Sequence, residues 1–142
     1  MGKTIIISNR LPVKIEQNKN ELIYKPSEGG LATGLNSVFK QGNNLWVGWP
    51  GLAIEKAQEA EVHSKLIEQH MKPVFLSNEE IEDFYEGFSN ETLWPNFHYF
   101  NQYTVYKEEL WLAYQRVNQK FAEIISEELE DDDTVWIHDY QL

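Results

Sequence analysis

The segment Thr4–Arg10, with the sequence Thr-Ile-Ile-Ile-Ser-Asn-Arg, constrains the fold more than any other part of this chain. Its three consecutive isoleucines at 5–7 lack polar alternation, a pattern typical of a strand that helices cover on both faces of a parallel sheet. The apolar run ends in Ser-Asn-Arg at 8–10, and Pro12 prevents a simple continuation. Open α/β sheets bind ligands at the carboxyl ends of their strands, so this polar end indicates a binding site.

A second stretch, Thr134–Tyr140, repeats the arrangement far along the chain. Apolar residues at 135–137 are followed at once by His-Asp-Tyr at 138–140. If the two strands run parallel in one sheet, Arg10 and Asp139 lie on the same rim. The sequence therefore predicts that a guanidinium and a carboxylate face one site.

The charge of the chain limits its partners. Its 142 residues carry 23 Asp and Glu against 12 Lys and Arg, a formal net charge of -11. Nucleic acids and anionic membranes require clustered basic residues, so we expect neither as a partner, and an anionic ligand must be held by a local group.

The sequence has no cysteine, which is compatible with a reducing compartment. No export or anchoring pattern stands at the amino terminus, and we expect a cytoplasmic protein.

Hydrophobic periodicity and turn residues predict the order of the elements. In the helix expected over 55–70, Leu66 and Ile67 are predicted to point inward. This order predicts a doubly wound, Rossmann-like α/β domain with a parallel sheet and a small β-hairpin excursion. The expected elements are strands at 4–10, 45–51, 73–76 and 134–137, a hairpin of 13–16 and 22–25, helices over 31–39, 55–70 and 107–130, and short helices between 81 and 99.

Two adjacent glycines, Gly29 and Gly30, precede the helix expected over 31–39. Glycines at a helix start let a phosphate approach free backbone N–H groups, and the positive end of the helix dipole favours it. A plain tight turn is the alternative interpretation of the same pair.

Aromatic residues concentrate between Ile81 and Tyr99, interrupted by Pro95. The spacing is too irregular for one helix, and Pro95 suits the first turn of a short one. Aromatic planes pack against the C–H faces of sugar rings, so this segment is a candidate sugar-binding wall, with ordinary core aromatics as the alternative. The acidic run Glu127–Asp133 lacks the alternation and glycine of a calcium loop, and we interpret it as a solvated cap.

Five motifs then stand in the order found in trehalose-6-phosphate synthases. They are Ser8–Pro12, Gly29–Gly34, Trp46–Gly51, the segment Phe88–Tyr99 and His138–Tyr140. Each is common alone, but together they span nearly all of the chain, and the sequence resembles that family. Glucosylglycerol-phosphate synthases and pseudo-glycosyltransferases share much of the pattern.

The resemblance implies a retaining, two-domain glycosyltransferase of the GT-B kind. Such enzymes transfer glucose from a nucleotide sugar, usually UDP-glucose, to glucose 6-phosphate. Residues 1–142 would form the amino-terminal, acceptor-side domain, with the nucleotide-sugar domain outside this chain. Alone, the chain is expected to turn over little or nothing. The family pattern includes no metal and no cofactor, since UDP-glucose is a substrate.

Residue roles follow from the resemblance, motif by motif. Arg10 would pair with the phosphate of glucose 6-phosphate, because its planar guanidinium can bind two phosphate oxygens at once. Tyr85 would donate a hydroxyl hydrogen bond to that acceptor, and Trp94 would shape the acceptor site and its anomer preference. Asp139, the candidate catalytic residue, would accept hydrogen bonds from sugar hydroxyls at the reacting centre. Gly29–Gly30 would meet the donor diphosphate.

The implied mechanism retains the anomeric configuration without an enzyme nucleophile, so the protein supplies alignment and charge stabilisation. Gln141 departs from the family, which usually has histidine at this position. Two other hypotheses remain: a sugar-phosphate-binding domain without transfer activity, and a structural or partner-binding domain without a sugar ligand.

Overall fold

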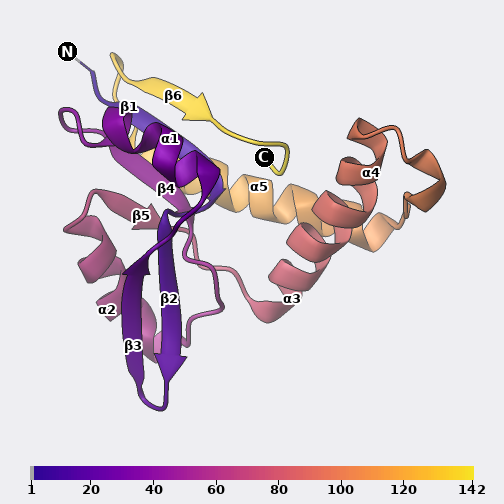
Figure 1. The fold of residues 1–142 in the computed structure, drawn as a ribbon, viewed down its shortest axis with the longest axis horizontal. Helices are drawn as coiled ribbons and strands as arrows, with labels where there is room; N and C mark the ends of the chain where they lie inside the picture. Colours follow the sequence, from indigo (N-terminus) through magenta and orange to yellow (C-terminus); the bar gives the residue numbers. More distant parts are fainter. Residues whose placement is uncertain (1) are drawn as a thin grey trace.

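A parallel sheet of four strands forms the centre of the molecule (Figure 1). The structure is a computed structural model and describes residues 2–142. The strands lie in the order β5-β4-β1-β6. Their bounds are β1 (Thr4–Arg10), β4 (Leu45–Trp49), β5 (Met71–Pro73) and β6 (Thr134–Ile137). The predicted doubly wound α/β fold is confirmed.

The strand order reverses beside β1. From β1 the chain proceeds outward to β4 and then β5, and it returns to place β6 on the opposite edge of β1. Ile5 of β1 is paired with Leu45 of β4 and with Val135 of β6, all in parallel. In open α/β sheets, such a reversal opens a crevice at the carboxyl ends of the strands.

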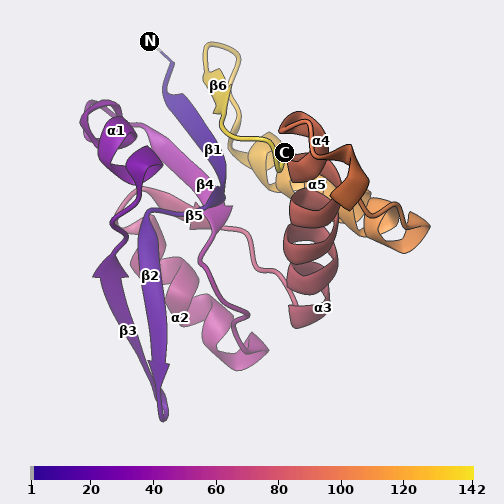
Figure 2. The same ribbon diagram turned by 45° about the vertical axis from the view of Figure 1, so that its right-hand side comes forward.

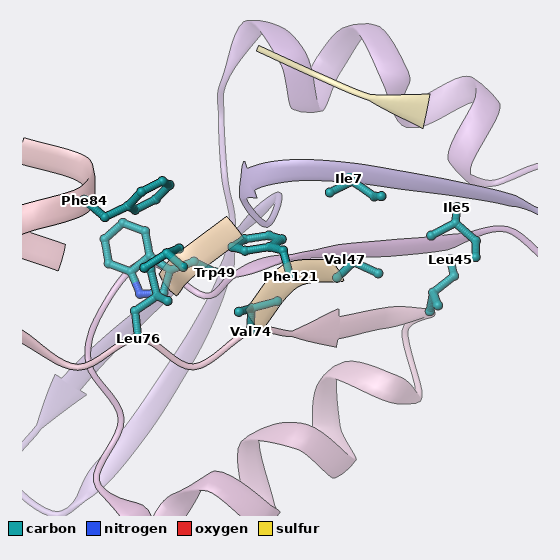
Figure 3. Close-up of a cluster of buried hydrophobic side chains, with 10 residues drawn as sticks. Ile5, Ile7, Leu45, Val47, Trp49, Val74, Leu76, Phe84 and Phe121 are labelled. Carbon is teal, nitrogen blue, oxygen red and sulfur yellow. The ribbon is translucent and has the colours of Figure 1, made fainter. Parts of the chain in front are cut away.

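Strand β1 separates two apolar cores, because its successive side chains point to opposite faces of the sheet. Ile5 and Ile7 pack on one face and Ile6 on the other, and all three are at most 1% exposed. This confirms the prediction that the isoleucine run is covered on both sides. Figure 3 shows the first core, which consists of Ile5, Ile7, Leu45, Val47, Trp49, Val74, Leu76, Phe84, Val117 and Phe121.

Helices cover both faces of the sheet. The long helix α5 (Glu108–Glu128) contributes Val117 and Phe121 to the first core. Helices α1 (Gly30–Phe39) and α2 (Lys56–Ile67) cover the other face. In α2 the inward residues are Val62 and Leu66, and the prediction that Ile67 points inward is wrong. Ile67 is the last residue of α2 and is 39% exposed, because α2 turns its Val62 and Leu66 side toward the sheet.

The predicted hairpin consists of β2 (Val13–Asn18) and β3 (Glu21–Pro26), which pair antiparallel and extend away from the main sheet (Figure 1). Its strands are longer than expected, and only Lys19 and Asn20 remain in the turn. Lys19 has a positive φ of 54°, as tight hairpin turns require.

The strand predicted at 73–76 is observed at Met71–Pro73 instead. Strand β5 ends at Pro73, where the prediction began, because β4 pairs only with Met71–Pro73. Val74 still donates its N–H to the Gly48 carbonyl at 2.8 Å, and the run then continues into the first core as extended chain. Burial of Val74 and Leu76 therefore made this stretch resemble a strand.

The aromatic segment consists of short helices, as predicted, and Pro95 lies in the first turn of one of them, but these helices follow one another without the expected breaks. It comprises α3 (Asn78–Glu80), the π-helix η1 (Ile81–Leu93) and α4 (Trp94–Phe97), and it lies beside α5 (Figures 1 and 2). A π-helix bonds residues five apart, so its inward positions do not follow the 3.6-residue period. The capping box of Ser77 and Glu80 begins it, and the short 3-10 helix η2 (Asn101–Tyr103) follows.

Gly48 in β4 allows the end of β1 to pass close to its neighbour. The pairing of β1 with β4 shifts register between Ile7 and Arg10, which marks a bulge. A Cβ at position 48 would stand 2.8 Å from the Ser8 carbonyl oxygen and 3.0 Å from the Leu11 nitrogen, and backbone atoms cannot move aside cheaply. The bulge that orients residues 8–10 therefore requires a glycine here.

We expect Gly48→Ala to lower the free energy of unfolding by about 2 kcal/mol or more, as overpacking does in buried sites. Gly34→Ala is the matched control, because position 34 lies in α1 with nothing within 4 Å of an added Cβ. Alanine in a helix interior is favoured over glycine by about 0.8 kcal/mol, so this control should stabilise the protein. Urea unfolding of both variants measures the difference, and equal changes in stability would contradict the close approach at Gly48.

Candidate functional site

A pocket of about 290 Å³ opens at the carboxyl ends of β1 and β6. We call it the rim pocket. It brings together four of the predicted site residues: Arg10, Gly29, Tyr85 and Asp139. The predicted convergence of a guanidinium and a carboxylate on one rim is therefore observed. The other residues that line it are Ser8, Asn9, Leu11, Pro12, Ser27, Leu31, Ala32, Trp46 and Gln141.

Arg10 is held by contacts from the neighbouring strand and the turn after it. Its guanidinium carbon lies 5.9 Å from the centroid of the Trp49 ring, a cation–π contact. Within residues 2–142, Arg10 makes no ion pair with a carboxylate. Its charge therefore remains available to an anionic ligand.

Gly51 lies outside the rim pocket but against Arg10, a role that the sequence did not indicate. It has a φ of +98°, which favours glycine. A Cβ at this position would stand 2.8 Å from Nη2 and 2.9 Å from Nε of Arg10. The turn after β4 thus provides a surface without a side chain, over which the guanidinium lies. Gly51 belongs to the Trp46–Gly51 motif, but no local sequence pattern indicates that this motif contacts Arg10.

The buried hydroxyl of Ser8 supports the backbone at Arg10. Ser8 Oγ accepts a hydrogen bond from Trp46 Nε1 at 2.8 Å and donates one to the Arg10 carbonyl at 2.7 Å. Both Ser8 and Trp46 are at most 2% exposed. Because buried hydrogen bonds of this kind are costly to lose, the bulge has a defined conformation.

Asp139 lies where the chain turns after β6. The His138 N–H still donates to the Ile7 carbonyl at 2.8 Å, so pairing with β1 continues to this residue. Asp139 then adopts a left-handed backbone, with φ 72°, and its Oδ1 accepts the N–H of Tyr140 at 2.9 Å. Aspartate tolerates this conformation better than most residues. The local turn therefore orients the carboxylate at the rim.

Aromatic side chains form one wall beside the rim pocket. The rings of Trp49 and Tyr85 have centroids 5.9 Å apart, and Tyr140 Oη donates to Asn90 Oδ1 at 3.1 Å. Burial, reinforced by the nearby Asp139 carboxylate and Tyr85, raises the pKa of the Tyr140 phenol. This phenol therefore stays protonated at neutral pH and can donate hydrogen bonds.

The glycine pair stands at the start of α1, as predicted. Gly29 is the N-cap, with φ −114°, and it lines the rim pocket, while Gly30 is the first helical residue. Neither glycine has a positive φ, and a Cβ at either position would meet nothing within 4 Å. The commonest tight turns accept most residues at negative φ, so these backbone angles do not decide between a phosphate site and a plain tight turn. Within the described residues, no packing requirement accounts for this pair.

Trp94 is not brought into the rim pocket. It lies with Asn90 and Phe100 in a separate depression of about 410 Å³, and it is 41% exposed. Its ring stacks on His98 with centroids 4.1 Å apart. Asn90 connects the two regions, because it accepts the hydrogen bond of Tyr140. The predicted role of Trp94 in shaping the acceptor site stays a prediction.

Two further properties concern metals and membranes. No group of three or more His, Asp or Glu side chains in residues 2–142 is arranged to hold a metal ion. Among the described helices, none combines the length and apolar character needed to cross a bilayer.

The structure is a Rossmann-like domain with a small pocket at the carboxyl ends of its strands. Residues 2–142 match the family model of glycosyltransferase family 20, and the chain belongs to this family.

Individual relatives agree with this assignment. The chain is 42% identical to the alpha,alpha-trehalose-phosphate synthase [UDP-forming] 56 kDa subunit of Kluyveromyces lactis, over 99% of this chain and 30% of that protein. A crystal structure of an alpha,alpha-trehalose-phosphate synthase (UDP-forming) from Burkholderia xenovorans in complex with glucose-6-phosphate superposes with TM-score 0.72 at 29% identity, over 99% of this chain and 29% of that one. A trehalose-6-phosphate structure from E. coli bound with UDP-2-fluoro glucose has the same TM-score and identity, over 99% and 28%. The chain thus spans under a third of the length of these relatives.

We expect Gly51→Ala to displace the Arg10 guanidinium, because the added Cβ would overlap Nη2. The matched control is Gly42→Ala, since Gly42 also has a positive φ of 72° but has nothing within 4 Å of a Cβ. Both variants should lose about 1–2 kcal/mol of stability from the left-handed backbone. Only Gly51→Ala should also shift the Arg10 Nε–H resonance in a ¹H–¹⁵N NMR spectrum. An unchanged resonance would show that Gly51 does not support Arg10.

Proposed function

We propose that this chain is the acceptor-side domain of a UDP-forming trehalose-phosphate synthase of the GT-B kind. In this proposal the complete enzyme transfers glucose from UDP-glucose to glucose 6-phosphate, with retention of configuration, in the cytoplasm. The observation that carries the proposal is the convergence of Arg10 and Asp139 in one small pocket. Membership of glycosyltransferase family 20 and the glucose-6-phosphate complex of a relative support it.

The chemistry of the rim pocket suits a sugar phosphate. The Arg10 guanidinium can donate two parallel hydrogen bonds to phosphate oxygens. The Asp139 carboxylate accepts hydrogen bonds from sugar hydroxyls, and Tyr85 supplies a phenol at the wall. A volume of about 290 Å³ is close to the lower end of typical small-molecule sites, as a single hexose phosphate requires.

The start of α1 suits the diphosphate of a nucleotide sugar. Gly29 lies at the pocket wall, and the first N–H groups of α1 lack helical partners. Without side chains at 29 and 30, the diphosphate can approach these groups closely, and the helix dipole favours its charge. We assign the donor diphosphate to this position.

The proposed mechanism rests on alignment and on stabilisation of the leaving group. Arg10 and Asp139 hold the acceptor so that its hydroxyl and the leaving phosphate lie on one face of the donor sugar. The leaving phosphate of the donor then takes the proton of the acceptor's hydroxyl group. Asp139 positions the acceptor more than it abstracts this proton. Alignment of this kind accounts for a large part of enzymatic rate enhancement. The remaining donor contacts would come from a second domain, which is the partner required for turnover.

We expect glucose 6-phosphate to bind the purified chain in isothermal titration calorimetry, with Arg10→Ala weakening binding by about 10- to 100-fold, the usual range for hydrogen bonds to a charged group. Arg116→Ala is the matched control, because Arg116 is exposed on α5 and does not line the rim pocket. Glycerol 3-phosphate serves as the competing acceptor. Tighter binding of glycerol 3-phosphate would favour the glucosylglycerol-phosphate synthases, and no sugar-phosphate binding at millimolar concentration would favour a structural domain.

We also expect the 142-residue chain to release no UDP from UDP-glucose and glucose 6-phosphate, because part of the donor site is supplied by the second domain. A coupled assay of UDP release, with a full-length family member assayed in parallel, tests this. UDP release that depends on glucose 6-phosphate and disappears in Asp139→Asn would show that the second domain is dispensable.

A further inference from the structure

Two buried amide side chains in the rim pocket have oxygens without hydrogen-bond partners. Asn9 and Gln141 are 5% and 7% exposed, and both line the pocket. Within residues 2–142, neither Asn9 Oδ1 nor Gln141 Oε1 is hydrogen-bonded. Buried polar atoms in native proteins are almost always paired, because an unpaired acceptor is costly. Two exceptions in one pocket therefore need a common explanation.

The neighbouring Ser8 shows that the location does not prevent pairing. Ser8 is as deeply buried as Asn9, yet its hydroxyl both accepts from Trp46 and donates to the Arg10 carbonyl. The chain therefore satisfies one polar side chain at this bulge completely and leaves its neighbour unsatisfied. A structural role explains Ser8 but does not explain Asn9.

Two different backbone features, a bulge and a turn, bring the side-chain amides of Asn9 and Gln141 to the pocket. Asn9 reaches it through the bulge at the end of β1, which Gly48 permits. Gln141 reaches it because the left-handed turn at Asp139 directs the chain back after β6. Asp139 thus presents its own carboxylate and also positions a second polar residue.

We propose that Asn9 and Gln141 are specificity-determining residues whose amides hydrogen-bond hydroxyl groups of the acceptor sugar. This inference rests on the proposed function and deepens it. The pocket holds a cation, Arg10, for the anionic group, while Asp139 and the two amides provide acceptors for hydroxyl protons. The ligand that satisfies this set carries one anionic group and several hydroxyl groups, which describes a hexose phosphate better than a three-carbon phosphate.

A site of this kind discriminates against ligands that lack a hydroxyl group. Without that hydroxyl the amide oxygen stays buried and unpaired, and polar sites reject such analogues far more strongly than apolar pockets reject a missing methylene group. We expect at least one monodeoxy glucose 6-phosphate to bind several-fold more weakly than glucose 6-phosphate.

The test replaces each amide by an apolar side chain of similar shape, in Gln141→Met and Asn9→Leu. Calorimetry compares glucose 6-phosphate with 2-deoxyglucose 6-phosphate, 3-deoxyglucose 6-phosphate and 1,5-anhydroglucitol 6-phosphate. For each variant we expect the affinity for glucose 6-phosphate to fall by about three- to tenfold, and the preference over one of these analogues to shrink by the same factor. The free energy of unfolding should stay the same or rise, because no unpaired oxygen remains.

Thr92→Val is the matched control for a buried polar group with a purely structural role. Thr92 is 5% exposed, and its Oγ1 donates to the Val105 carbonyl at 2.6 Å. This variant should lose stability and keep the wild-type preference among the analogues, which is the opposite of the result expected for Gln141→Met.

The outcomes separate this inference from the proposed function. A loss of stability in Gln141→Met and Asn9→Leu with unchanged preference among the analogues would overturn the inference, even if Arg10→Ala still weakens binding as expected. An absence of glucose 6-phosphate binding in the unmodified chain would overturn both. The two variants test the inference independently, because Asn9 lies in β1 and Gln141 lies beyond the last strand.

Discussion

The double burial of strand β1 is the constraint on which the rest of the structure depends. Its isoleucine side chains alternate between two cores, and its backbone is hydrogen-bonded to β4 on one edge and β6 on the other. A slip of one residue would exchange the side chains between the faces and disrupt both cores. The position of Arg10 at the end of the strand is therefore determined by packing several residues away.

Strand β4 and the turn after it serve the site mainly by supporting β1. Trp46 donates to Ser8, Gly48 accommodates the β1 backbone, and Trp49 and Gly51 lie against the Arg10 guanidinium. The Trp46–Gly51 motif is recognisable in the sequence, yet of its residues only Trp46 lines the rim pocket. Its physical role is to hold another strand's arginine in one orientation.

The predictions made from periodicity were correct where one element packs against a flat neighbour with regular spacing. The isoleucine run, the hairpin and the helix expected over 107–130 belong to this group. They were wrong where burial and secondary structure do not coincide. The stretch after Pro73 is buried without forming a strand, and the aromatic segment is helical with a π-type repeat that the 3.6-residue period does not describe.

The sequence by itself determined the α/β class, the central strand, and the polar groups at the strand ends, because these depend on local periodicity and on residue type. It also placed Arg10 and Asp139 on one rim and the glycine pair at the start of a helix. Only the tertiary structure decided that Gly51 supports Arg10, that Trp94 lies outside the rim pocket, and that Asn9 and Gln141 are buried with unpaired oxygens. The reason is that available space and unsatisfied hydrogen bonds are properties of atoms from distant segments, which no local pattern records.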